Sequence, residues 1–201
     1  MYEKRIIEFE QEDAQKFPAP DVNLFVGSSS IRRWYSLKRD MEPKPILRRG
    51  FGGSDMKSLL LLYDKLIKPY TFSKLFVYEG DNDLSGRKGY PQKVLDLFIQ
   101  IEEKAHVQCP NAEIIFISIK CSPTRERYWN KFMAANKLFE EYCSTKSYLN
   151  FIDIASAMFD KNGKANKELF NEHDGIHPSQ KGYETIAQII KPYLYPSDID
   201  K

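Results

Sequence analysis

The chain contains little cysteine, almost no net charge and no long apolar run. Its 201 residues include three cysteines, Cys109, Cys121 and Cys143, too few and too scattered for a disulfide framework or a zinc site. The odd count fits a reducing compartment, and Cys121, at the end of an apolar run, is interpreted as a buried thiol. A formal net charge of +2, with one short basic cluster at 48–50, does not indicate a nucleic-acid partner.

A membrane span and a signal peptide are also missing from the sequence. No apolar run approaches the ~20 residues that a membrane-spanning helix needs, and the first residues, "MYEKRIIEFEQED", lack an uninterrupted apolar segment. We therefore expect a cytoplasmic protein, or an exported one whose leader was removed from this chain. The sequence carries no indication of an oligomeric state.

What is present is an alternation of strand-like and helix-like segments. Apolar runs of strand length occur at 23–26, 45–48, 74–78, 113–119 and 149–153, and segments of helical periodicity at 54–67, 90–106, 126–143 and 178–194. Near-continuous apolar strands are typical of a parallel sheet covered on both faces. We predict one α/β domain spanning 1–201, with its core at about 21–194, a short N-terminal extension and a loose tail, "PSDIDK".

Two helix starts are predicted from capping preferences. Ser54 is expected to cap the helix at 54–67, and Pro178 is expected to lie in the first turn of the last helix.

In an open parallel sheet, ligands bind beyond the carboxyl ends of the strands. The loops of interest are therefore "GSSS", "RGFGGSD", "EGDNDLSG", "KCSPTRER" and, late in the chain, "NEHDGIHPS".

The first of these loops places three serines where a helix begins. Gly27 permits a sharp turn after the strand, and a serine hydroxyl at this point is either a helix cap or a nucleophile, with its own backbone N–H available to an oxyanion. The loop is not the G-x-S-x-G elbow of α/β-hydrolases, because Ile31 stands in place of the second glycine. It also lacks the Gly-Lys pair of a P-loop.

A nucleophilic serine needs a base, and the chain has three histidines. His106 is expected at the surface of a helix. His173 and His177 flank "DGI", and Asp174 lies three residues before His177. This spacing lets the carboxylate hold one ring nitrogen while the other accepts a proton from serine. The alternative is an incidental polar group at a helix start.

The second and third loops suggest further polar groups. "RRGFGGSD" fails the dinucleotide fingerprint, since Asp55 replaces the third glycine, and its glycines either form a tight turn or bring an N–H group to a reacting oxygen. In "EGDNDLSG", Asn82 is a candidate amide donor at a strand end. Asp81 and Asp83 also match early positions of a calcium loop, but Gln92 replaces its final glutamate and the preceding segment is strand-like.

Taken in order, "GSSS", "GFGGS", "GDND" and "DGIH" resemble the four motifs of the SGNH hydrolases, or GDSL esterases, over roughly residues 21–190. The resemblance implies a flavodoxin-like three-layer sandwich with a five-stranded parallel sheet. It also implies that Ser29 is the nucleophile, although Ser28 stands where the family usually has aspartate and Ser30 where it has leucine or isoleucine. His177 is then the base and Asp174 its orienting partner.

The same resemblance implies an oxyanion hole formed by the N–H groups of Ser29 and Gly53 and by the amide of Asn82, with Gly52 replacing Gly53 if the loop is registered differently. We expect a carboxylic ester hydrolase that needs no metal or cofactor and acts on small acyl esters, with acetyl esters and carbohydrate-linked esters as candidates. The alternatives are a thioesterase or acyltransferase with the same residues, or a non-catalytic binding module on the same fold.

Two segments are candidates for specificity. "SPTRERYWN" at 122–130 either walls the substrate site through Arg125, Arg127 or Trp129, or is an ordinary helix start with a packed tryptophan. The run 32–34, Arg32, Arg33 and Trp34, either lines a pocket or covers the sheet.

Overall fold

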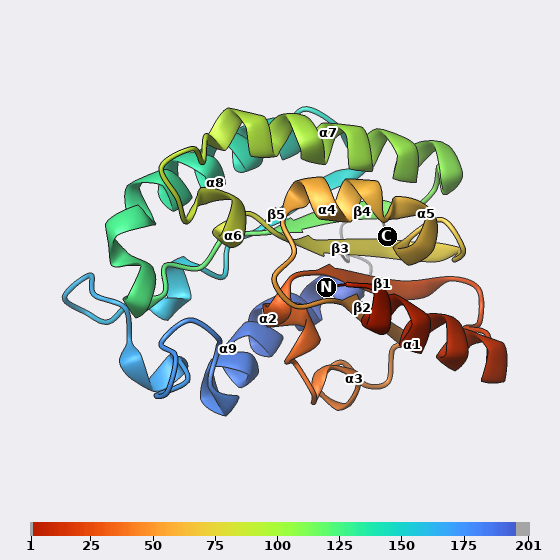
Figure 1. The fold of residues 1–201 in the computed structure, drawn as a ribbon, viewed down its shortest axis with the longest axis horizontal. Helices are drawn as coiled ribbons and strands as arrows, with labels where there is room; N and C mark the ends of the chain where they lie inside the picture. Colours follow the sequence, from red (N-terminus) through yellow and green to blue (C-terminus); the bar gives the residue numbers. More distant parts are fainter. Residues whose placement is uncertain (1, 196–201) are drawn as a thin grey trace.

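The structure is a computed structural model that describes residues 2–195, and it has a five-stranded, all-parallel sheet at its centre (Figure 1). The strands are β1 (Val22–Gly27), β2 (Ile46–Gly50), β3 (Phe72–Tyr78), β4 (Glu113–Ile117) and β5 (Leu149–Ile152). Their order in the sheet is β2-β1-β3-β4-β5. The predicted α/β fold class, with five parallel strands at the five apolar runs, is confirmed. The tail "PSDIDK" lies outside the described residues.

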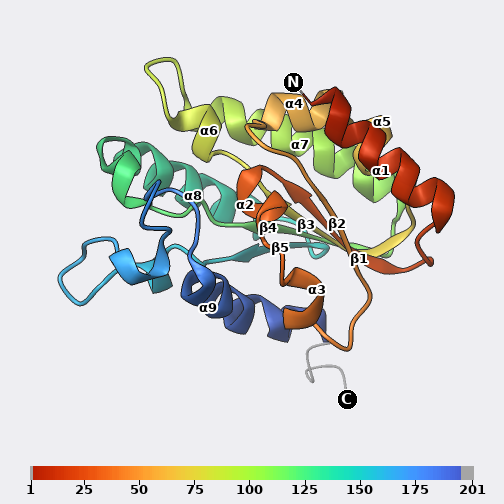
Figure 2. The ribbon, with the colours of Figure 1, turned by 60° about the horizontal axis from the view of Figure 1, so that its bottom comes forward.

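Helices cover both faces of this sheet, as the two views together show (Figures 1 and 2). One face carries α1 (Glu3–Gln15), α4 (Met56–Leu61), α5 (Tyr63–Leu66), α7 (Pro91–Gln108) and α8 (Trp129–Cys143), and the other carries α2 (Ser29–Arg32), α3 (Leu37–Asp40) and α9 (Gln180–Ile190). A single turn, α6 (Asp81–Leu84), follows β3, and 3₁₀ turns lie at Pro123–Tyr128 (η1), Ser156–Met158, Lys167–Leu169 and Lys191–Leu194.

The strands are mostly apolar because successive side chains enter two different cores. In β1, Leu24 and Val26 pack in the core between the sheet and helices α1, α4 and α7. Phe25 packs in the core on the opposite face, against α2 and α9. Successive side chains of a strand point to opposite faces of the sheet. All three residues are fully buried, so apolar and polar side chains do not alternate here. A continuous apolar run therefore predicts this strand.

The topology fixes where a site can form. The chain moves outward in one direction from β1 to β2, then crosses back to β3 on the other side of β1. In doubly wound sheets, the crevice at this reversal lies beyond the carboxyl ends of the two strands. The loops that follow β1 and β3 carry Ser29 and Asn82.

Several predicted helix details are wrong. Asp55, not Ser54, caps α4, because its carboxylate accepts from the Ser58 N–H at 2.8 Å, while the Ser54 hydroxyl is buried against Glu79 and Phe51. The segment 54–67 is two helices that meet at Leu62. Pro178 precedes α9, whose N-cap is Ser179.

Two other elements differ from the prediction. The segment 126–143 begins as the 3₁₀ turn η1 and becomes α-helical at Trp129. Residues 3–15, interpreted from the sequence only as an extension, form α1, which buries Ile6 and Phe9 against the sheet. No helix within residues 2–195 has the length and apolarity to cross a membrane.

Candidate active site

The loop after β1 presents Ser29 at the carboxyl edge of the sheet. Gly27 adopts φ 142°, and a Cβ atom there would lie 2.1 Å from the Tyr78 carbonyl oxygen, so only glycine permits this close approach. Ser28 is buried and its hydroxyl has no hydrogen-bond partner within residues 2–195. The Ser28 side chain makes no capping hydrogen bond. Ser29 opens the single turn α2, and its hydroxyl faces a histidine instead.

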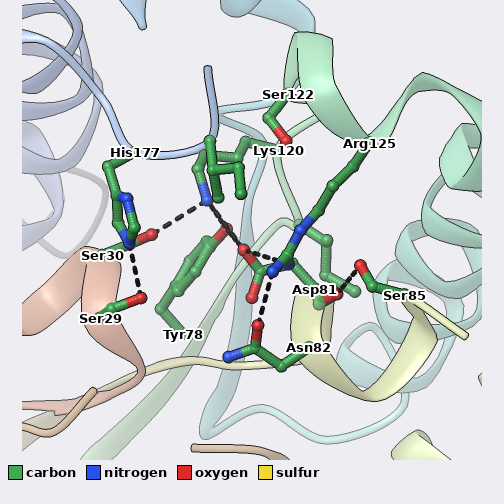
Figure 3. A network of polar contacts seen from close by, with 12 residues as sticks. Ser29, Ser30, Tyr78, Asp81, Asn82, Ser85, Lys120, Ser122, Arg125 and His177 are labelled. Carbon is green, nitrogen blue, oxygen red and sulfur yellow. Dashed lines mark hydrogen bonds and ion pairs between the residues drawn. The ribbon is translucent and has the colours of Figure 1, made fainter. Parts of the chain in front are cut away.

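Ser29, His177 and Asp174 form a continuous hydrogen-bonded chain. The Nε2 atom of His177 lies 2.7 Å from the Ser29 Oγ atom, and its Nδ1 atom lies 2.8 Å from the Asp174 Oδ2 atom. Figure 3 shows the His177 ring directed at Ser29. This is the geometry in which a carboxylate fixes the imidazole tautomer and leaves Nε2 free to accept the serine proton. The structure therefore brings the three sequence-predicted residues together.

The Asp174 carboxylate is held by its own loop. Its Oδ1 atom accepts from the backbone N–H groups of Ile176 at 2.8 Å and His177 at 2.9 Å. Burial acts to raise the pKa of Asp174, but these N–H groups and the His177 ring outweigh it and hold the pKa well below its usual range. Gly175, at φ 58°, lets the loop fold back so tightly.

Arg33, which the sequence suggested only as a residue that lines a pocket or covers the sheet, contacts the Asp174 carboxylate. Its Nη1 atom lies 2.9 Å from the same Asp174 Oδ2 atom that meets the histidine. Burial lowers the pKa of His177, the Asp174 hydrogen bond raises it, and the positive charges of Lys120 and Arg33 lower it further, so that the net pKa lies below its ordinary 6.5. His177 is therefore neutral at pH 7, as a general base must be.

The predicted oxyanion donors other than the Ser29 N–H lie in the loops after β2 and β3. Gly53 is exposed and has φ 73°, a left-handed conformation that favours glycine. Within the described part of the chain, the backbone N–H groups of Ser29, Gly52 and Gly53 have no hydrogen-bond acceptor, so each is free to donate to a ligand. The assignment of Gly53, with Gly52 as the alternative, stays a prediction.

Asn82 lies in the turn after β3. Its Nδ2 atom donates to the Ser54 carbonyl oxygen at 2.7 Å, and its Oδ1 atom accepts from the Nη2 atom of Arg125 at 2.8 Å. An amide nitrogen carries two hydrogens, so one of them is left after the bond to Ser54. The oxyanion role of Asn82 also stays a prediction.

The calcium-loop alternative does not fit the side chains of this turn. The Oδ2 atom of Asp81 is paired with the Lys120 ammonium at 2.9 Å, and the carboxylate of Asp83 accepts from the Met56 N–H at 3.0 Å. Both carboxylates are therefore engaged by protein donors. No cluster of three metal-ligating side chains occurs among the described residues.

The specificity candidates separate into buried and exposed groups. Trp34 is buried and stacks on Tyr183, so it covers the sheet. Trp129 donates to the Ser122 carbonyl oxygen and packs against the core. This agrees with the alternative in which it is a packed tryptophan at a helix start and not a wall of the substrate site. Arg127 is exposed, with its guanidinium 4.7 Å from the centre of the Tyr128 ring. Arg125 turns inward to Asn82 rather than lining an open wall.

A pocket of about 440 Å³ adjoins His177. It is lined by Arg33, Tyr35, Ser36, Arg39, Asn171, His177, Pro178, Ser179, Gln180 and Tyr183. Tyr35 is 81% exposed, and most of the other groups are hydrogen-bond donors or acceptors.

His106 is not a free surface residue. Its ring stacks on Tyr148 with the two ring centres 3.7 Å apart, and the residue is half-buried. Cys121 is buried, as expected, and burial raises the pKa of its thiol to about 12. Neither residue contacts the group around Ser29.

Solved structures with a similar fold cover most of this chain. A putative platelet activating factor from Streptococcus pneumonia has a similar structure, with 25% identity and a TM-score of 0.84 over 96% of this chain and 92% of that chain. A GDSL-like lipase from Bacteroides thetaiotaomicron is 18% identical, with a TM-score of 0.80 over 94% and 96% of the two chains. No family model and no curated protein matches the sequence itself.

A carbohydrate esterase of family 3 from Talaromyces cellulolyticus is more distant, with 14% identity and a TM-score of 0.66 over 88% of this chain and 96% of that chain. The chain therefore has the fold of the SGNH, or GDSL, hydrolases, and the resemblance predicted from its four loop motifs is confirmed. The expected class, a carboxylic ester hydrolase, is the class that the lipase and esterase names describe.

Proposed function

We propose that this protein is a serine esterase that hydrolyses small acyl esters through an acyl-enzyme on Ser29. The observation that carries the proposal is the unbroken chain from the Ser29 Oγ atom, through both His177 ring nitrogens, to the Asp174 carboxylate. This arrangement activates a hydroxyl that is otherwise a poor nucleophile at neutral pH. No metal or cofactor takes part in the proposed steps.

In the first half-reaction, the Ser29 Oγ atom bonds to the ester carbonyl carbon while its proton passes to the His177 Nε2 atom. The carbonyl oxygen becomes an oxyanion, which accepts from the N–H groups of Ser29 and Gly53 and from the Asn82 amide. The carbon–oxygen bond to the alcohol then breaks, and the alkoxide takes the proton from His177. The Asp174 carboxylate stabilises the imidazolium throughout.

In the second half-reaction, a water molecule gives a proton to His177 and its oxygen bonds to the acyl carbon. The same donors hold the second oxyanion. The bond between the acyl carbon and the Ser29 Oγ atom breaks, the serine recovers its proton from His177, and the carboxylic acid is released. Each oxyanion donor of this kind is typically worth ~10²–10³ in turnover.

For the alcohol part of the substrate, the pocket beside His177 favours a polar group. It combines an exposed aromatic ring, Tyr35, with amides and guanidiniums. This composition suits a sugar or another hydroxyl-rich alcohol better than a long alkyl chain. The structurally similar protein from Talaromyces, a carbohydrate esterase, also supports a sugar as the alcohol part of the substrate.

The test is hydrolysis of p-nitrophenyl acetate, butyrate and octanoate by the native chain and by two serine variants. Ser29→Ala is expected to fall to the buffer rate. Ser28→Ala is the matched control, because its hydroxyl has no partner among the described residues, and it is expected to keep the native rate. Equal rates for the native chain and Ser29→Ala would contradict the proposal.

A further inference from the structure

A buried polar network runs beneath the site from the nucleophile loop to Asn82 (Figure 3). At its centre lies Lys120, in the loop after β4, with a relative exposure of 1%. Its Nζ atom donates to the Ser30 hydroxyl at 2.9 Å, to the Tyr78 hydroxyl at 2.8 Å and to the Asp81 Oδ2 atom at 2.9 Å. Three acceptors match the three protons of an ammonium group.

The charges in this network depend on each other. Burial alone raises the pKa of Asp81, but Lys120 and Arg125 outweigh it, so the pKa of Asp81 lies below its ordinary value. Burial lowers the pKa of Lys120, and the Asp81 carboxylate opposes that shift. Asp81 is thus an anion at neutral pH. Its carboxylate pairs with a second cation, the Arg125 guanidinium, as well as with Lys120.

Arg125 contacts two residues of the turn α6, Asp81 and Asn82. It comes from η1 (Pro123–Tyr128), and its side chain is only 16% exposed. Its Nη1 atom lies 3.4 Å from the Asp81 Oδ2 atom, and its Nη2 atom donates to the Asn82 Oδ1 atom at 2.8 Å. The planar guanidinium fork reaches both groups at once, which a lysine ammonium, as a point charge, does not reproduce.

The Asn82 amide is therefore fixed at both ends. The Ser54 carbonyl oxygen accepts one Nδ2 hydrogen, and Arg125 occupies the Oδ1 atom. With both contacts made, the amide plane is set and the second Nδ2 hydrogen has one direction left. A cationic donor on the amide oxygen also polarises the amide, which strengthens the N–H group as a donor.

We propose that Arg125 is a positioning residue that fixes and polarises the Asn82 amide for oxyanion binding. The inference rests on the proposed function, because it gives Asn82 its role in that reaction. Arg125 does not touch the substrate in this account and acts only through Asn82. Its removal is expected to lower kcat by about 10- to 100-fold, less than the ~10²–10³ typical of deleting an oxyanion donor itself, with little change in KM.

The catalytic test is a double-mutant cycle with Arg125→Ala and Asn82→Ala. If Arg125 acts through Asn82, Arg125→Ala lowers kcat in the native background but causes no further loss in the Asn82→Ala background. Arg127→Ala is the matched control, since Arg127 lies on the same turn and is exposed. Guanidinium chloride at low millimolar concentration is expected to restore part of the kcat of Arg125→Ala, while equal sodium chloride does not.

A second measurement does not depend on turnover. In a ¹⁵N–¹H correlation spectrum, the Asn82 side-chain amide, assigned by its loss in Asn82→Ala, is expected to be shifted from the positions of free amides. It should move toward them in Arg125→Ala and stay in place in Arg127→Ala. An unmoved signal would overturn the inference even if the native chain hydrolyses esters.

The outcomes separate the two proposals. A shifted Asn82 signal in a protein that hydrolyses no ester supports Arg125 as the residue that positions Asn82, but contradicts the proposed function. Additive losses in the double-mutant cycle, or no rescue by guanidinium, would overturn the inference and leave the esterase in place. Circular dichroism and thermal unfolding of each variant show whether the fold is retained.

Discussion

The two halves of the site are supported in different ways. On the acid–base half, Asp174 and His177 lie three residues apart, and the loop between them supplies the N–H groups that hold the carboxylate. On the oxyanion half, Asn82 is held by the Ser54 carbonyl oxygen and by Arg125, which are 28 and 43 residues away. In the first half, the carboxylate and the base come from one loop, whereas in the second half the amide is oriented entirely by segments distant in the sequence.

One turn supports both halves. The Thr124 hydroxyl donates to the Asp174 carbonyl oxygen at 2.7 Å, and the Thr124 N–H donates to the Gly175 carbonyl oxygen at 3.2 Å. Its neighbour Arg125 reaches Asn82 on the other side. The turn η1, after β4, therefore fixes the positions of the base loop and of the amide relative to one another.

The largest effect is expected on the acid–base half. His177→Ala removes the group that accepts the Ser29 proton and protonates the alcohol, so kcat should fall by about 10⁴-fold or more, to the activity that oxyanion donors and binding alone supply. The measurement is steady-state hydrolysis of p-nitrophenyl acetate. His173→Ala is the matched control, because His173 is 84% exposed and lies four residues away. Similar losses in both variants would show that the loop, and not the imidazole, was disturbed.

A smaller loss is expected on the oxyanion half. Asn82→Ala deletes one donor of the proposed hole while leaving the nucleophile and base in place, so kcat should fall by ~10²–10³-fold. The control is Asn130→Ala, an exposed asparagine at the start of α8. If KM rises and kcat is unchanged, Asn82 binds the substrate in its ground state and is not an oxyanion donor.

The acid–base half can be tuned through Arg33. Its positive charge disfavours the imidazolium and so contributes to the lowered pKa of His177. The native kcat/KM is expected to rise with pH through an apparent pKa below 6.5 and to level off by pH 7. Arg33→Met removes a charge that opposes protonation, so this pKa should increase, and the increase should be small because solvent screens the Arg33 side chain, which is 38% exposed.

The comparison for that experiment is Arg39→Met, whose side chain is 71% exposed and pairs with Asp40 rather than Asp174. Its pH profile should superimpose on that of the native chain. An acid limb that moves to lower pH in Arg33→Met would contradict the assignment of that limb to His177.

The smallest effect is expected from the N-terminal helix. The Tyr2 hydroxyl donates to the Gly53 carbonyl oxygen at 3.1 Å, and its ring meets Phe51 edge to face at 4.9 Å between ring centres. Tyr2→Phe keeps the ring and loses the hydroxyl. Because such a bond has a net value of about 0.5–1.5 kcal/mol, kcat should fall by about two- to tenfold if Gly53 is an oxyanion donor.

The unfolding temperature of Tyr2→Phe distinguishes a local effect on Gly53 from a general loss of stability. It should fall by no more than about 1–6 °C, the shift that a bond of this value produces in a domain of this size. An unchanged kcat would favour Gly52 as the donor, since the Gly53 carbonyl would then not influence the site.

The sequence predicted the sheet well because its strands are buried on both faces. Each apolar run, such as the one that became β3 (Phe72–Tyr78), is bounded by polar or turn residues. Helix starts were less predictable. Ser54 and Asp55 both have capping side chains, and the outcome depended on the burial of Ser54 beside Glu79, a contact 25 residues away.

The candidate site divides in the same way. The contact between Asp174 and His177 follows from their spacing, and the structure brings Ser29 to them. Arg33, Lys120 and Arg125 were not predicted as partners, because a sequence pattern does not say toward which group a long cation points. Arg125 and Arg127 are neighbours on one turn, yet one is turned inward and the other outward.

The most direct test of the account is covalent labelling by a fluorophosphonate, followed by mass-spectrometric mapping of the labelled peptide. We expect modification of Ser29, with Ser28 and Ser30 unmodified, and labelling that is lost in His177→Ala. A label on another residue, or a native chain that hydrolyses p-nitrophenyl acetate but is neither labelled nor inhibited, would contradict an acyl-enzyme on Ser29.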